Sequence, residues 1–338
     1  MKLVINLMRI YVLLFWIMVP LWGHTLTIDK VVIWGHKLHV DTHSYIHYAF
    51  DRSFKFLGYE TYWFDHTTIL TSFDCKNTLF IAEGHAFNMP IRDDCFYILH
   101  NVLDHQYQSI YDAGRAIKLQ VYTHDCLERN VEKIDECMYK DYSAKTIYLP
   151  WATDLLPHEI DAIKSKIKDV TRTKEIYYVG TIMGYSQGLF ETVSVISPFQ
   201  TACAENDISF IVKKNQDLDV TIDLIQKSYM APALQGPWQV SQGYIPCRIF
   251  KNISYGQFGI TNSETVYKLF KKKIIYNPDP QQLFYKAQEK LHTISLSELY
   301  DIMDFVRDNH TYINRIEMIL DFLSEVYEKV HKDQNAQV

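Results

Sequence analysis

The chain has 338 residues, more than one hydrophobic core usually organises, so we expect two domains. Hydrophobic residues make up 48% of the chain and charged residues 22%, which argues against a disordered protein. A formal net charge of −6 argues against nonspecific binding to nucleic acid. The six cysteines are scattered without a Cys-x-x-Cys pair, so neither a zinc site nor a dense disulfide framework is indicated.

The chain begins with a short apolar run from Ile10 to Trp22, preceded by Lys2 and Arg9. The run is short for a membrane span and typical of the core of a signal peptide. The residues around Gly23 make a poor small-x-small cleavage site, so an uncleaved signal anchor is the alternative. We therefore assign residues 1–27 to a signal peptide or signal anchor, which predicts membrane association or entry into the secretory pathway.

Apolar runs then alternate with helical spacing over residues 28–155. The first apolar run, residues 30–34, is followed by apolar residues at helical spacing from Ile46 to Leu57. Gly58 is suited to end the helix that this spacing predicts. The predicted strands of this part are 30–34, 60–64, 78–82, 95–99, 119–123 and 146–149. Strands that alternate with helices indicate a parallel, doubly wound sheet.

The same alternation restarts after a charged segment, residues 156–172, which we assign to a linker with a helical piece. A second domain is predicted over residues 173–295. Its predicted strands are 175–181, 208–212, 258–262 and 273–276, and its first helix is predicted over 189–196. Residues 296–330 are helical: Ser295 with Glu298 forms a capping box, and apolar residues then recur three and four apart as far as Val330.

The most informative segment is 243–262. Pro246 suits the start of a helix and Gly256 its end, and Ile249, Phe250 and Ile253 give it one apolar face. Three polar side chains lie on another face of this helix: Arg248, Lys251 and Asn252. Two cations beside a positively polarised helix N-terminus suit a diphosphate. The alternative is an ordinary amphipathic helix with solvated basic residues.

This segment, within the order of elements around it, resembles group 1 GT-B-fold glycosyltransferases, most closely the spore-maturation-type branch. The donor-binding helix of that branch has the pattern Pro-x-Arg-x-Phe-Glu, then Gly, then a strand. Pro246, Arg248 and Phe250 match it, whereas Lys251 stands where the pattern has an acid for the nucleotide ribose. The resemblance implies an α/β fold of two Rossmann-like doubly wound parallel-sheet domains (GT-B type) with a C-terminal crossover helix. Residues 28–155 would bind the acceptor, 173–295 the nucleotide sugar, and 296–330 would cross back.

The resemblance further implies a hexosyltransferase-like enzyme. It would move a sugar from a nucleotide-diphosphate sugar to a hydroxyl of a carbohydrate, lipid or protein acceptor, with no cofactor and no metal. The predicted donor-binding residues are Gly180, Thr181, Tyr244, Arg248, Lys251 and Asn252. Neither Gly-x-Gly-x-x-Gly nor a P-loop motif occurs in the chain. The sugar, the nucleotide, the acceptor and the stereochemical course stay open.

Polar residues follow the first predicted strand, and ligands of open α/β sheets bind outside the carboxyl ends of strands. Inverting glycosyl transfer needs a base for the acceptor proton, and the candidates are Asp41 and His43, with His39 behind them. The alternative is that Asp41 caps the following helix while the histidines pack or are solvated. The spacing of His39, His43 and His47 could suit a metal, but no neighbouring acid or cysteine completes a ligand set, so no metal site is predicted.

Three further strand ends carry a histidine beside a polar partner. They are Glu83-Gly84-His85, His100-Asn101 and Thr123-His124-Asp125. Since the carboxyl ends of parallel strands meet at one edge, these groups are expected to share a cleft, with His85 and His124 as acceptor-side residues. Two other protein classes fit the same pattern. A secreted two-lobed solute-binding protein needs no catalytic base, and a catalytically inert GT-B-like protein would only bind.

Overall fold

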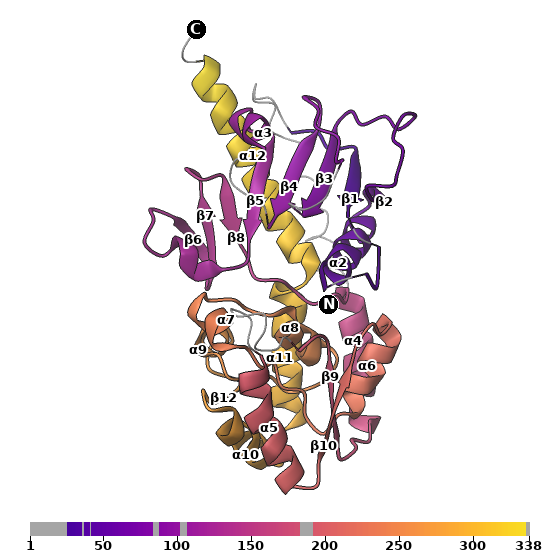
Figure 1. Ribbon diagram of the computed structural model, residues 1–338, viewed down its shortest axis with the longest axis vertical. Coiled ribbons are helices and arrows are strands. Elements are labelled where there is room, and N and C mark those ends of the chain that lie inside the picture. Colours follow the sequence, from indigo (N-terminus) through magenta and orange to yellow (C-terminus); the bar gives the residue numbers. More distant parts are fainter. Residues whose placement is uncertain are drawn as a thin grey trace, which may run out of the picture.

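The computed structural model describes residues 26–35, 37–40, 42–83, 88–101, 107–182 and 192–335. Within these ranges the chain forms two α/β lobes stacked along the long axis of the molecule (Figure 1). The predicted signal segment lies outside the described residues as far as position 25. No helix in the described part is both long enough and apolar enough to cross a membrane.

The first lobe is built on an eight-stranded sheet in the order β2-β1-β3-β4-β5-β8-β7-β6. Neighbouring strands pair in parallel from β2 to β8, and the last two strands are antiparallel. The strands are β1 (Lys30–Trp34), β2 (Glu60–Phe64), β3 (Thr78–Glu83), β4 (Phe96–His100), β5 (Ala116–Gln120), β6 (Glu132–Asp135), β7 (Met138–Asp141) and β8 (Thr146–Tyr148). The six predicted strands of this lobe are thus confirmed, and the β6–β7 hairpin is an addition that its short, largely polar strands did not signal.

The strand predicted over 119–123 lies three residues earlier, as β5. The side-chain oxygen of Gln120 accepts hydrogen bonds from the backbone N–H groups of Val121 and Tyr122, which ends the ladder there. A short 3₁₀ helix, η1 (Thr123–Cys126), follows instead of further strand.

Alternate residues of the strands face opposite sides of this sheet, as a period of two requires. Val31, Ile33 and the residues of the neighbouring strands that face the same side pack against α2 (Thr42–Phe56) and α12 (Tyr312–Asn335). Val32, Trp34 and their equivalents pack on the other face, which α3 (Gln108–Asp112) helps to cover. Both faces are therefore buried, which leaves the ends of the strands to carry polar chemistry.

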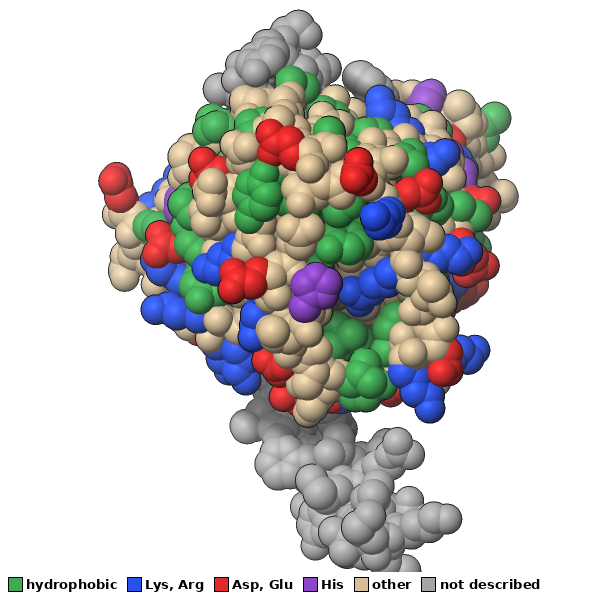
Figure 2. All heavy atoms as spheres, turned by 90° about the horizontal axis from the view of Figure 1, so that it is seen from below, with side chains coloured by type: hydrophobic (Ala, Val, Ile, Leu, Met, Phe, Trp, Pro, Cys, Tyr) green, Lys and Arg blue, Asp and Glu red, His purple; other side chains and the backbone are tan. Residues whose placement is uncertain are grey.

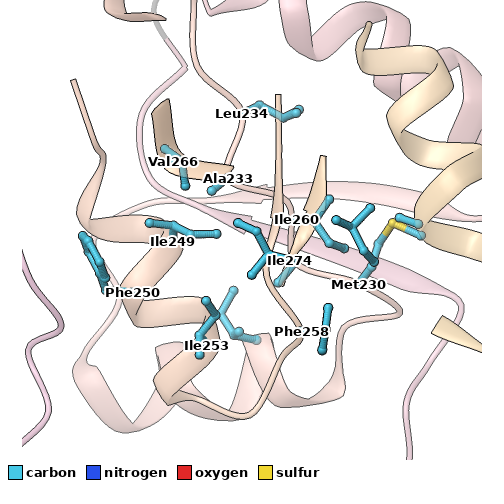
Figure 3. Close-up of a cluster of buried hydrophobic side chains, with 14 of the residues drawn as sticks. Met230, Ala233, Leu234, Ile249, Phe250, Ile253, Phe258, Ile260, Val266 and Ile274 are labelled. Carbon is cyan, nitrogen blue, oxygen red and sulfur yellow. The ribbon is translucent and has the colours of Figure 1, made fainter. Parts of the chain in front are cut away.

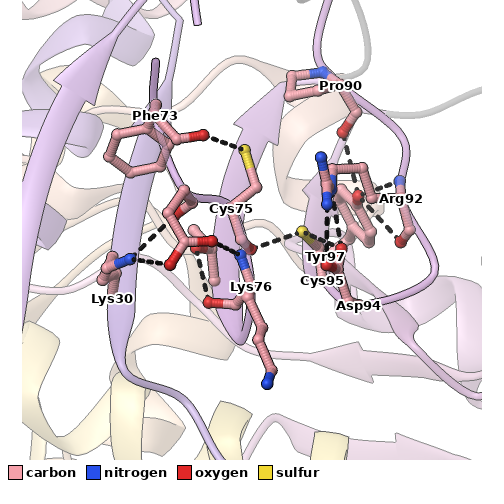
Figure 4. Close-up of polar contacts among 11 residues, drawn as sticks. Lys30, Phe73, Cys75, Lys76, Pro90, Arg92, Asp94, Cys95 and Tyr97 are labelled. Atoms are coloured by element: carbon pink, nitrogen blue, oxygen red, sulfur yellow. Dashed lines mark hydrogen bonds and ion pairs between the residues drawn. The ribbon is translucent and has the colours of Figure 1, made fainter. Parts of the chain in front are cut away.

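Polar contacts fasten the amino ends of β1, β3 and β4 (Figure 4). The Nζ atom of Lys30 donates to the carbonyl and the carboxylate of Asp74 at 2.9 and 3.2 Å. The Cys95 thiol donates to the carbonyl of Cys75 at 3.0 Å, and Arg92 pairs with Asp94 at 2.8 Å. These contacts are local and structural, and they lie at the end of the sheet opposite to the predicted site.

The second lobe contains two parallel strand pairs surrounded by helices. The pairs are β9 (Glu175–Val179) with β10 (Ser209–Lys213), and β11 (Ile260–Thr261) with β12 (Ile275–Tyr276). The helices are α4 (Pro157–Lys166), the 3₁₀ helix η2 (Ile167–Asp169), α5 (Val193–Glu205), α6 (Leu218–Lys227), α7 (Pro237–Ser241), α8 (Cys247–Ser254), α9 (Glu264–Leu269), α10 (Pro280–Leu291) and α11 (Leu296–Asn309). Of the helix predicted over 189–196, residues 189–191 lie outside the described part of the chain; α5 begins at Val193 and extends nine residues beyond the predicted end, to Glu205.

The apolar face predicted for the segment after Pro246 lies in the core of this lobe (Figure 3). Ile249, Phe250 and Ile253 are fully buried and pack with Ile260 and Ile274. Gly256 ends the helical segment with φ +95°, a conformation that favours glycine. The sequence pattern therefore predicted α8 correctly from its start to its end.

The chain crosses back to the first lobe between α11 and α12. The helix α11 packs on α8 and α4, whereas α12 packs on α2 and β5. At the crossing, the backbone N–H of Thr153 donates to the carbonyl of His310 at 3.0 Å. The buried guanidinium of Arg315 donates to the carbonyl of Pro150 at 2.8 Å. These features confirm the predicted fold class, including its crossover helix.

A cavity of about 650 Å³ lies among β12, α10 and the start of α11. Its rim carries four lysines and three acids: Lys272, Lys273, Lys286, Lys290, Glu289, Glu298 and Asp301. Figure 2 views the molecule from the second-lobe end and shows the two charge signs interspersed over that face. Because neither sign dominates, and because the cavity is away from the predicted strand ends, we place no functional site there.

Candidate functional site

The loop after β1 reaches from the first lobe to the second. The Nδ1 atom of His39 lies 2.9 Å from the hydroxyl of Tyr45, and its Nε2 atom lies 2.8 Å from Oδ1 of Asp217. Asp217 is the N-cap residue of α6 in the second lobe, but its side chain caps no backbone N–H there. His39 therefore bridges the two lobes.

His43, in the first turn of α2, lies between two side chains from neighbouring strands. Its Nδ1 atom is 2.9 Å from Oε1 of Glu83, the last residue of β3. Its Nε2 atom is 2.9 Å from the amide nitrogen of Asn101, which follows β4. Glu83 is 8% exposed. Burial opposes its charge, but the hydrogen bond and charge of His43, with His100 and Asn101, lower the pKa of Glu83 to about 2.

Two buried histidines support this arrangement from behind. The Nε2 atoms of His47 and His100 lie 3.0 Å apart, so one hydrogen is shared between two imidazoles. Burial, reinforced by repulsion from His47 and His43, holds the pKa of His100 well below its usual value. Gly35 has φ +154°, and a Cβ atom there would lie 2.7 Å from Cε1 of His47. The end of β1 therefore needs glycine to admit this pair.

The histidines at 39, 43 and 47 do not converge on one point, because each has different partners. Among the described residues, no group of three or more His, Cys, Asp or Glu side chains is arranged to hold a metal ion. An acid does lie beside His43, but it comes from β3 and is forty residues away in sequence. Because the fold brings Glu83 to His43, this pairing could not be predicted from positions close in the sequence.

On the second lobe, Arg248 and Gly180 lie against each other. The guanidinium carbon of Arg248 is 4.0 Å from the centre of the Tyr178 ring, and its Nη2 donates to the carbonyl of Val179 at 3.3 Å. A Cβ atom on Gly180, which has φ +139°, would lie 2.5 Å from the same Nη2. Two residues separately predicted to bind the donor are thus adjacent at the first turn of α8.

Arg248 keeps unused hydrogen-bonding capacity. Its Nε atom is buried and has no partner among the described residues, and the same holds for the hydroxyl of Tyr178. An unmet N–H on a cation is costly unless an acceptor arrives. Arg248 also stands at the positively polarised end of α8, a poor place for a cation on its own. This geometry suits an anion.

Lys251 has a partner already. Its Nζ atom lies 2.7 Å from Oδ2 of Asp154, and the hydroxyl of Tyr255 donates to Oδ1 of the same carboxylate at 2.6 Å. Burial opposes the charge of Lys251, but Asp154 outweighs it and the pKa of Lys251 is raised. The pair fastens α8 to the segment that follows the first sheet.

The other predicted donor residues occupy different places. Asn252 is 3% exposed and donates from Nδ2 to the carbonyl of Ala231 at 2.9 Å, a contact within the second lobe. Thr181 is exposed directly after Gly180. Tyr244 lies at the seam between the lobes, with its ring centre 5.8 Å from that of Tyr122.

His124 belongs to that same seam. Its Nδ1 atom lies 2.8 Å from the carbonyl of Ser241, and the hydroxyl of Thr123 donates to the carbonyl of Gly243 at 2.9 Å. Gly243 has φ +64°, and a Cβ atom there would collide with the His124 ring. His124 thus joins the lobes. Asp41 and His85, the remaining predicted residues, lie outside the described part of the chain.

No family model and no curated protein matches this sequence. Among solved structures, the chain is similar to an alpha-glucosyltransferase (AGT) in complex with UDP, with a TM-score of 0.51. Identity is 10%, over 86% of this chain and 99% of that chain. A likeness at this identity shows the fold, which is the GT-B type. The spore-maturation-type branch has no support beyond the sequence resemblance.

Four residues that contact predicted site residues are not themselves among the predicted site residues. They are Glu83 beside His43, Asp154 beside Lys251, Tyr178 beneath Arg248 and Asp217 beside His39. Glu83 is one of the polar residues that the sequence places at the strand ends, and this position is the signal that identifies it. Tyr178 lies inside a predicted strand two residues before Gly180, where a buried aromatic residue is unremarkable.

Proposed function

We propose that the protein is a glycosyltransferase that moves a sugar from a nucleotide-diphosphate sugar to an acceptor hydroxyl. The observation that carries this proposal is the contact of Arg248 with the Gly180 turn at the start of α8. A guanidinium with a buried, unmet Nε–H beside a helix N-terminus suits a diphosphate. The GT-B fold shared with a UDP-bound glucosyltransferase adds support at the level of the fold.

On the donor side, Arg248 stabilises the charge that develops on the leaving diphosphate, so the proposed transfer needs no metal. Gly180 admits the guanidinium and Thr181 offers a hydroxyl at the same turn. Lys251 acts on the donor through α8, because its pair with Asp154 fixes the helix relative to the first lobe. Tyr244, at the seam between the lobes, lines the proposed site. Asn252 supports α8 through its hydrogen bond to the carbonyl of Ala231.

On the acceptor side, His43 is the proposed base for an inverting transfer. The acceptor hydroxyl gives its proton to Nε2 of His43 while its oxygen forms the new bond to the anomeric carbon. The bond from that carbon to the diphosphate oxygen breaks, and the electron pair leaves with the diphosphate. Asp41 remains a second candidate base. His39, which bridges to Asp217, holds the two lobes in register around both substrates.

The first experiment measures protection of the purified protein against heat by uridine diphosphate, other nucleoside diphosphates and free sugars. We expect nucleoside diphosphates to raise the melting temperature and free sugars to have no effect. Protection by free sugars alone would favour the solute-binding alternative. A panel of nucleotide sugars with a hydrolysis readout then separates an enzyme from an inert relative, which would bind a nucleotide without turnover.

A further inference from the structure

Glu83 is in a position to decide which nitrogen of His43 carries hydrogen. Its Oε1 lies 2.9 Å from Nδ1 of His43, and its burial and place at the end of a central strand restrict its movement. An ionised carboxylate only accepts hydrogen bonds, so the hydrogen between the two groups belongs to His43. The low pKa of Glu83, about 2, agrees with an ionised partner.

The second nitrogen of His43 follows from the first. A neutral imidazole has one N–H, so with hydrogen on Nδ1 the Nε2 atom has a free lone pair. The amide of Asn101 donates to that lone pair at 2.9 Å. Asn101 is exposed and has φ +54°, a left-handed conformation at the surface end of β4. The lone pair of His43 therefore points to the solvent side, and the Asn101 amide occupies the position that a substrate hydroxyl would take.

The residues behind His43 keep this orientation. Glu83 and His100 are register partners on β3 and β4, so the two side chains are fixed side by side. The His43 and His100 ring centres are 5.4 Å apart. His100 is engaged with His47, so its Nε2 is not available to replace Glu83 as a partner of His43. Of the described groups around Nδ1 of His43, the Glu83 carboxylate is the one that bonds to it.

We propose that Glu83 is a positioning residue for His43, holding it as the Nδ1–H tautomer with the Nε2 lone pair directed at the acceptor hydroxyl. This inference rests on the proposed function. During transfer the O–H bond of the acceptor breaks and an N–H bond forms at Nε2, which makes His43 an imidazolium. The Glu83 carboxylate stabilises that cation and does not take the proton itself.

The test uses Glu83→Gln in the full chain, with the tautomer of His43 read from long-range ¹H–¹⁵N spectra and assigned with His43→Gln. Glutamine can turn its amide N–H toward Nδ1, which permits the Nε2–H form that cannot act as a base. We expect the Nε2–H population to rise and kcat to fall about 10- to 100-fold, while donor affinity changes less than twofold. Asp141→Asn is the matched control, because Asp141 is a buried carboxylate of the same sheet but lies in β7.

Three results would overturn the inference: a wild-type protein with hydrogen on Nε2 of His43, unchanged turnover in Glu83→Gln, or an equal loss in Asp141→Asn. If Glu83→Gln does not fold, Glu83→Asp tests the same point, since its carboxylate still excludes the Nε2–H form. The Glu83→Asp variant should keep His43 as the Nδ1–H tautomer, and its kcat should fall less than tenfold. A fall in kcat as large as in His43→Ala would contradict the inference. If Glu83→Gln shifts the tautomer of His43 but the wild-type protein turns over no nucleotide sugar, Glu83 still positions His43 and the proposed function is wrong.

Discussion

The two lobes hold the charged groups of the proposed site in opposite ways. On the first lobe, both ring nitrogens of His43 have partners, and its acidic neighbour is buried. On the second lobe, Arg248 has an unmet Nε–H, although the cation one turn later is paired with Asp154. The first arrangement is complete without substrate, as proton transfer at a fixed atom requires. Within the described part of the chain, the second leaves a hydrogen-bond donor without an acceptor, which we propose that an anion supplies.

The largest expected effect is on the first lobe. His43→Ala should lower kcat about 10²- to 10⁴-fold, the usual contribution of a general base, with donor affinity within twofold of wild type. Initial rates over a range of acceptor concentrations, with donor binding measured separately, check this. Normal turnover with only a raised KM would instead make His43 a binding residue and shift the role of base to Asp41.

The next effect concerns the paired cation. Lys251→Met leaves the Asp154 carboxylate, which is 7% exposed, without its ammonium partner. We expect the free energy of unfolding to fall by about 2–4 kcal/mol, less than for a fully buried pair because the lysine is partly exposed. Urea unfolding measures it, and Lys251→Met with Asp154→Asn should recover part of the loss. A variant with wild-type stability and lost donor affinity would show that Lys251 contacts the donor directly.

A smaller effect should appear as pH falls. The pKa of Glu83 is lowered to about 2 from an ordinary value of 4.5, so its stabilising contribution is complete above pH 4.5 and is lost as pH falls toward 2. The contribution amounts to about 3 kcal/mol. The difference in unfolding free energy between wild type and Glu83→Gln should therefore shrink between pH 4.5 and 2. A difference independent of pH across this range would mean that the Glu83 carboxylate is not held as the structure shows.

The contrast between the lobes also explains what the sequence could predict. The helix α8 is one continuous segment, and its start after Pro246, its end before Gly256 and its buried face are all local properties. The cluster around His43 unites residues of α2, β3 and β4, and strand register places Glu83 opposite His100. Register between distant strands has no local signature, so Glu83 is recognised in the sequence as a polar strand end but not as the partner of His43. The pair of Lys251 with Asp154 was missed for the same reason, because it joins the two lobes.

The most direct test of the donor site compares the binding of uridine diphosphate to wild type and to Arg248→Ala by calorimetry. We expect affinity to fall by about 1.5–3 kcal/mol, the range for hydrogen bonds to a charged group, or about 10- to 150-fold. Folding should be preserved, because Ile249, Phe250 and Ile253 remain buried. Lys268→Ala, an exposed cation of α9, is the control and should bind as wild type does. Equal affinity of wild type and a well-folded Arg248→Ala protein would contradict the donor site, and with it the main support for a glycosyltransferase.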